Sequence, residues 1–224
     1  MRIAAWLCTV VGLTNGAALV AREPDTAAVS AENAAPKRTW RPKAHKPEFF
    51  SIRVDQKCKP GQLPADCPFQ GYGLRLEDGI VIATPYNKWW DPKLPIFLVD
   101  SDTQCYTVSK KPLQLYVNTV NGALRYAPVG WLPENAVAFS FYKTGNNPLG
   151  MIDPSPAYFA WPSTEGRTSS FFAGTWWLCP LTGTGQYQVF ISDFNFGDKS
   201  KQGGVTKDQC TRMSLAAVNA NPWS

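Results

Sequence analysis

The chain has 224 residues and a formal net charge of +5, a length that suits one domain or at most two small ones. Its 17 glycines and 19 prolines interrupt the sequence too often for an all-helical fold, and a hydrophobic fraction of 44% with 17% charged residues excludes general disorder. The small, scattered charge argues against a nucleic-acid-binding surface, in which lysines and arginines cluster.

The first 38 residues have the composition of export and processing signals. Residues 1–21 combine an early arginine, a short apolar run and small residues, which is typical of a secretory signal peptide and too short to span a bilayer. We therefore expect a secreted protein without a transmembrane segment. Residues 22–38 are polar and end in Lys37 and Arg38, which predicts a dibasic processing site that closes a pro-segment; an unprocessed flexible linker is the alternative.

Residues 39–48 form a basic, proline-rich tail that holds the only histidine of the chain, His45. Its prolines predict an extended and solvated segment. Ser-His-Asp and Cys-His catalysis, and most zinc sites, need an imidazole held beside other functional groups. A histidine on such a tail is badly placed for these roles, so we expect no catalytic residue, no metal site and no cofactor.

From residue 49 to residue 218 the sequence has the pattern of short strands separated by turns. An Asp-Gly pair at 78–79 predicts a hairpin between strands at 72–76 and 80–82. The other candidate strands are 49–54, 96–99, 106–108, 113–117, 123–126, 137–142, 157–161, 175–178 and 187–191. Residues 213–218 are expected to close the domain as a strand or a short helix, before a C-terminal tail at 219–224. We predict one all-β domain of antiparallel strands, either a β-trefoil, favoured by a loose threefold grouping of hairpins, or a β-sandwich.

Five cysteines remain once the signal peptide is removed, and in an oxidising compartment they are expected to pair. Cys58 and Cys67 flank a loop containing proline and glycine, which favours a local disulfide. Cys179 and Cys210 could tie a late strand to the C-terminal segment. Cys105 is then left unpaired, or forms a disulfide-linked dimer; the sequence leaves this connectivity open.

Two Trp-Trp pairs provide the candidate ligand-binding residues. Neighbouring side chains on a strand point to opposite faces, so one ring of each pair should leave the core, where it could stack on a sugar ring. The pair Trp89 and Trp90, with Tyr86 nearby, is the better candidate because its context resembles a loop, and Trp177 is the candidate from the second pair. The alternative is that these rings fill the ends of a β core, and the same choice applies to Trp131 and Trp161.

Paired carboxylates could instead indicate a glycosidase, which needs one acid and one base or nucleophile close together. Asp100 and Asp102 would share a face if extended, but Asp residues in this context more often bond neighbouring backbone N–H groups in a turn. The other acidic residues considered, Glu134, Asp153, Glu165 and Asp193, are scattered.

The C-terminal third resembles a family of fungal secreted proteins that includes PhiA-like cell-wall proteins and IgE-binding allergens. The resemblance rests on residues 172–180 (FAGTWWLCP), residues 185–191 (GQYQVFI) and the Asp-Gln-Cys sequence at 208–210, and more faintly on residues 113–117 and 49–53. It implies an extracellular or wall-associated protein without known catalysis.

These observations predict a secreted, non-catalytic protein that binds cell-wall polysaccharide or a host extracellular component through aromatic loops. A carbohydrate-active enzyme that uses two carboxylates is one alternative. A structural wall component cross-linked through the unpaired thiol is another.

Overall fold

The structure is a computed structural model and describes residues 40–144, 157–162, 176–181, 183–191 and 207–223. The described residues belong to one compact unit. The described residues contain β-strands and two three-residue 3₁₀ turns, Pro64–Asp66 and Lys207–Gln209, and none of their helices is long or apolar enough to cross a membrane. The predicted all-β class is therefore confirmed.

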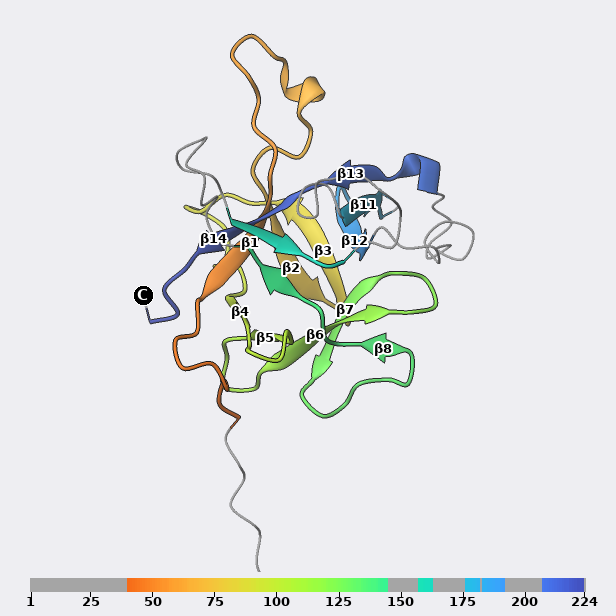
Figure 1. Cartoon of the computed structure of the whole chain (residues 1–224). Helices are drawn as coiled ribbons and strands as arrows, with labels where there is room; N and C mark the ends of the chain where they lie inside the picture. The colour runs from red at the N-terminus through yellow and green to blue at the C-terminus, as the bar shows by residue number, and fades with distance from the viewer. Residues whose placement is uncertain (1–39, 145–156, 163–175, 182, 192–206, 224) are drawn as a thin grey trace, which may run out of the picture. The chain divides into compact units, whose positions relative to one another are not determined.

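Seven antiparallel strands close into a barrel (Figure 1). In spatial order they are β1 (Phe50–Val54), β2 (Tyr72–Glu77), β3 (Ile80–Pro85), β7 (Leu124–Pro128), β6 (Leu113–Asn118), β5 (Cys105–Thr107) and β4 (Phe97–Val99). The circuit closes where Phe50 of β1 pairs with Phe97 of β4. Closure satisfies backbone groups that an open sheet would leave unpaired at its edges.

The remaining strands extend this barrel at three places. β14 (Leu215–Asn219) pairs along the whole of β1 and carries β10 (Ala157–Ala160) and then β9 (Tyr142–Lys143). β12 (Tyr187–Ile191) pairs with β3 and carries β11 (Trp176–Pro180) and then β13 (Thr211–Met213). β8 (Ala136–Val137) pairs with β6.

Most strands lie where the alternating pattern predicts them. The β2–β3 hairpin turns at Asp78 and Gly79, which both have positive φ, at 48° and 79°, as a two-residue hairpin turn requires. One prediction is wrong: residues 137–142 are not a continuous strand, because Ser140 has a φ of 70° and separates β8 from β9. The closing segment, left open between strand and helix, forms strands.

The core contains a stack of aromatic rings. Phe159 of β10 lies between Phe141 and Trp176, with ring centroids 5.4 Å and 5.2 Å away and nearly parallel planes, and all three side chains are fully buried. The indole N–H of Trp176 donates to the Phe159 carbonyl at 2.7 Å. Burying such a ring contributes roughly 4–6 kcal/mol before conformational entropy is subtracted, far more than a surface ion pair.

Two disulfides join Cys58 to Cys67 and Cys179 to Cys210, the pairs that the spacing suggests. Among the described cysteines only Cys105 is free, and it is fully buried. Disulfides of this kind indicate an oxidising compartment.

Candidate functional site

The loop that joins β3 to β4, residues 86–96, presents two indole rings to solvent. The side chains of Trp89 and Trp90 are 76% and 84% exposed, which is unusual for residues of this size. They are adjacent in a turn at residues 88–90, so neither ring belongs to a strand face. We call residues 86–91 the tryptophan loop.

Hydrogen bonds between side chains and backbone determine the conformation of the tryptophan loop. The Asn87 side-chain oxygen accepts the Trp89 N–H at 2.9 Å, and the Asp91 carboxylate accepts the Asn87 N–H at 2.7 Å. The Asn87 carbonyl also accepts the backbone N–H groups of Trp90 and Asp91, at 3.2 Å and 2.9 Å. Such Asx turns hold their shape without burying the residues they carry.

Further contacts fix this loop to the barrel. Arg75 of β2 forms an ion pair with Asp91 at 3.6 Å, and the Tyr86 N–H donates to the Gly71 carbonyl at 2.9 Å. Leu94 is buried against Gly73 of β2 so closely that a Cβ at Gly73 would lie 2.6 Å from a Leu94 methyl carbon. The loop is therefore held at both ends while its two indoles remain in water.

Each of the two exposed indoles offers a flat apolar ring to solvent, and a cation lies beside one of them. The Lys88 ammonium lies 4.5 Å from the centre of the Trp89 ring, within cation-π range. Most of the Trp89 surface nevertheless remains accessible to solvent. A face of this kind can stack on another flat apolar surface, such as the C–H face of a sugar ring.

The other predicted aromatic residues have different surroundings. Tyr86 is half-buried, with the Arg53 guanidinium 5.3 Å from its ring centre. Trp177 is half-buried and packs against a small cluster that includes Cys179 and Phe190, so its ring is mainly a packing group. Trp161 packs edge-on against the buried Phe141 in the main core, whereas Trp131 is exposed on a separate loop after β7.

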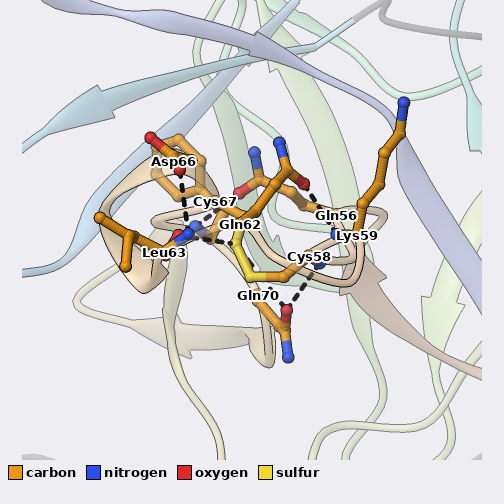
Figure 2. The surroundings of a disulfide bond; sticks show 9 residues. Gln56, Cys58, Lys59, Gln62, Leu63, Asp66, Cys67 and Gln70 are labelled. Carbon is orange, nitrogen blue, oxygen red and sulfur yellow. Dashed lines mark hydrogen bonds between the residues drawn. A yellow bond between two sulfur atoms is a disulfide. The ribbon is translucent and has the colours of Figure 1, made fainter.

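A second loop lies at the same end of the barrel as the tryptophan loop. The two loops meet where the Tyr86 N–H donates to the carbonyl of Gly71, the last residue of the second loop. This disulfide loop, residues 55–71, joins β1 to β2 and extends away from the barrel in Figure 1. Figure 2 shows that side-chain oxygens of this loop accept its backbone N–H groups. The Gln70 oxygen accepts the N–H of Cys58 at 2.7 Å, and the Gln62 oxygen accepts the N–H of Lys59 at 2.7 Å. The Asp66 carboxylate accepts the N–H of Leu63 at 3.0 Å. The Leu63 side chain is exposed. The cysteine spacing indicates the loop, but nothing local in the sequence indicates that Leu63 is presented to solvent.

The carboxylates considered for catalysis hold the N-terminal tail instead. Asp100 is buried and accepts the backbone N–H groups of Lys43 and Ala44 at 2.8 Å and 2.7 Å, as well as that of Ser101. Asp102 forms an ion pair with the Lys43 ammonium at 2.7 Å. Burial alone would raise the pKa of Asp100, but the three backbone N–H donors outweigh it and lower the pKa below its ordinary value.

An acid of this kind is ionised at neutral pH, so Asp100 is unsuited to be the proton donor of a glycosidase. The prolines of the tail predict a solvated segment, but the tail packs against the barrel and is not fully solvated. The Trp40 ring lies 4.7 Å from the ring of Tyr106, centre to centre, and the tail continues across the turn between β4 and β5 to Asp100.

Several other predicted features can be placed only in part. His45 and Glu134 are exposed, whereas Asp153, Glu165, Asp193, Lys37 and Arg38 lie outside the described residues. In the described part of the chain, no three His, Cys, Asp or Glu side chains are arranged to hold a metal ion. Comparison of the chain with protein-family models, with curated proteins and with solved structures finds no match.

Proposed function

We propose that this is a secreted, non-catalytic extracellular or cell-wall protein, and that its tryptophan loop binds glycan. The observation that carries the proposal is the exposure of two adjacent indoles on a loop held by side-chain hydrogen bonds. Exposing two such rings forgoes the free energy that their burial would contribute. A partner that covers them would recover part of that free energy.

Carbohydrate is the favoured partner because the loop combines exposed indole rings with a cation. A pyranose ring has apolar C–H faces that stack on an indole, and its hydroxyl groups can reach polar atoms at the rim. Lys88 and the backbone of the tryptophan loop supply such polar atoms. Cell-wall polysaccharide is the proposed ligand, and a host extracellular glycan is the alternative.

The proposed location rests on the predicted signal peptide and on the two disulfides. Membership in the PhiA-like family remains a proposal supported by short motifs. Two of these motifs overlap β11 and β12, which pair with each other, and the third contains Cys210, which is bonded to Cys179 of β11. The elements that carry the resemblance are therefore neighbours in space.

The two alternative functions have less support than glycan binding. The two-carboxylate enzyme would need Asp100 or Asp102 free, and both are engaged with the tail. The wall component cross-linked through a thiol would need Cys105 accessible, and this thiol is buried. For the fold, the closed circuit supports a barrel, as in a β-trefoil, over the separate sheets of a β-sandwich, although seven strands do not divide into three equal repeats.

Isothermal titration of the secreted protein with soluble wall glucans, chitin oligomers and host glycans tests the proposal. We expect Trp89→Ala and Trp90→Ala each to weaken binding by roughly tenfold, which corresponds to ~1.4 kcal/mol. Trp223→Ala is the matched control, because that ring is also 84% exposed but lies near the C-terminus. The proposal is wrong if no glycan binds, if the control loses as much affinity, or if anionic lipid vesicles bind the loop and glycans do not.

A further inference from the structure

A hollow of about 460 Å³ lies between the N-terminal tail and the barrel, formed by residues outside the tryptophan loop. The tail supplies one wall, including Pro47 and Glu48, and Thr103 in the turn between β4 and β5 supplies part of another. Val99 and Asp100 also line it, and Phe141, Tyr142 and Lys143 form the remaining side, where Phe141 packs in the aromatic core. Because Asp100 holds the tail by two hydrogen bonds, the wall that the tail supplies is fixed relative to the barrel.

Thr103, which lines this hollow, and Ser140, which precedes the lining residue Phe141, have backbone conformations that L-amino acids avoid. Thr103 has a φ of 62° and Ser140 a φ of 70°. The first is a genuine outlier, because a β-branched side chain is crowded in the left-handed region. The two residues support each other: the Ser140 N–H donates to the Thr103 hydroxyl at 2.9 Å, and the Phe141 N–H donates to the Thr103 carbonyl at 2.9 Å. Strain that persists through such support is characteristic of binding sites.

Four charged side chains line the hollow: Lys46, Glu48, Asp100 and Lys143. Asp100 is buried and already accepts backbone N–H groups of the tail, whereas Glu48 and Lys143 pair with each other and are unequally buried. The Lys143 side chain is only 12% exposed, and its ammonium contacts the carboxylate of Glu48, whose side chain is 71% exposed. A buried ammonium needs an anion beside it, whereas an exposed glutamate can swing into water at little cost. The carboxylate of a ligand can therefore displace that of Glu48 and take its place beside the Lys143 ammonium.

We propose that this hollow binds an acidic sugar residue, with the carboxylate of the sugar replacing that of Glu48 beside Lys143. The exposed ring of Tyr142 offers a face on which the sugar ring can stack, and Lys46, also on the hollow, adds a second cation. Carboxylate recognition and ring stacking together select a uronic acid over a neutral sugar and over a small carboxylate without a ring. This site is separate from the tryptophan loop and does not depend on the function proposed for it.

Isothermal titration of the intact secreted protein with a galacturonic acid trisaccharide tests this proposal. A neutral galactose trisaccharide and citrate are the comparison ligands. We expect the acidic trisaccharide to bind at least tenfold more tightly than either. Lys143→Gln should lower its affinity at least tenfold, whereas Glu48→Gln should raise it severalfold, because the internal competitor is removed.

Lys110→Gln is the matched control, since it removes one exposed cation away from the hollow and should leave binding unchanged. Trp89→Ala should also leave it unchanged, which separates this proposal from that for the tryptophan loop. The proposal is overturned if the neutral trisaccharide or citrate binds as well as the acidic one. It is also overturned if Glu48→Gln weakens binding, because Glu48 would then be a contact rather than a competitor.

Discussion

Gly73 of β2 determines how closely the segment after the tryptophan loop approaches the barrel. A side chain at this position would overlap Leu94, which is buried and anchors the end of the loop. The contact is therefore both a packing constraint and a constraint on where the indoles lie.

We predict that Gly73→Ala destabilises the domain by about 1–3 kcal/mol, the usual cost of overpacking, and weakens glycan binding by displacing the loop. Urea unfolding and isothermal titration measure the two effects. The double variant Gly73→Ala with Leu94→Ala restores space for the new methyl group, so its loss should be smaller than the sum of the two single losses. Simple addition of those losses would contradict the proposed contact.

At the scale of the element, the N-terminal tail depends on one buried carboxylate. Asp100 accepts two backbone N–H groups of the tail, and these hydrogen bonds exist in full only while the carboxylate is ionised. Its pKa is lowered in the folded protein from an ordinary value of 3.8. The stability that it contributes is therefore present above that ordinary value and is lost as the pH falls through the lower, folded value.

We predict that Asp100→Asn destabilises the protein by about 1.5–3 kcal/mol at pH 7, as expected for hydrogen bonds to a charged group. Below pH 3.8 the difference between this variant and the wild type should shrink. Urea unfolding between pH 2.5 and pH 7 measures it. Asp102→Asn is the control, with an expected loss under about 1 kcal/mol, because it breaks an ion pair with an exposed lysine. If the difference in unfolding free energy between Asp100→Asn and the wild type does not change with pH, the role given to the ionised Asp100 carboxylate is wrong.

The two disulfides are expected to stabilise different parts of the fold. Cys58 and Cys67 are 9 residues apart in a loop with its own hydrogen bonds, whereas Cys179 and Cys210 are 31 residues apart and join β11 to the segment before β13. Chain entropy predicts losses of about 3 and about 4 kcal/mol when each pair is replaced by alanine. Hydrogen exchange should show lost protection in the disulfide loop for the first pair and in β11 and β13 for the second. If replacing Cys58 and Cys67 lowered hydrogen-exchange protection across the whole barrel, this division would be contradicted.

At the scale of the whole molecule, local signals in the sequence predict the strands but not how the barrel closes. Alternation and the Asp-Gly turn identify β2 and β3 because these signals lie within a few residues. The pairing of Phe50 with Phe97 joins strands that are distant in the chain, and no local pattern indicates it. The break at Ser140 is hidden for the same reason, since its support comes from Thr103, 37 residues away.

At the candidate site, too, local sequence signals do not indicate contacts between residues that are distant in the chain. The loop-like context of Trp89 and Trp90 predicts a candidate surface, and the structure gives the hydrogen bonds that present it. The period-two rule predicts that the rings of Trp176 and Trp177 lie on opposite faces of the strand, but it shows neither that Trp176 is the ring in the main core nor that Trp177 packs against a second small cluster. The docking of the tail on Asp100 depends on residues 56 and 57 positions apart, so the sequence indicates only a solvated linker.

The central claim is that the tryptophan loop is a preformed surface for a glycan. The most direct test is a proton–nitrogen NMR titration that follows the indole N–H signals of the secreted protein, assigned with Trp89→Ala and Trp90→Ala, as a wall glucan or chitin oligomer is added. The account predicts that the signals of Trp89 and Trp90 move together and saturate, while that of the buried Trp176 stays fixed. Saturating binding that leaves both signals in place, or no binding by any glycan, would contradict it.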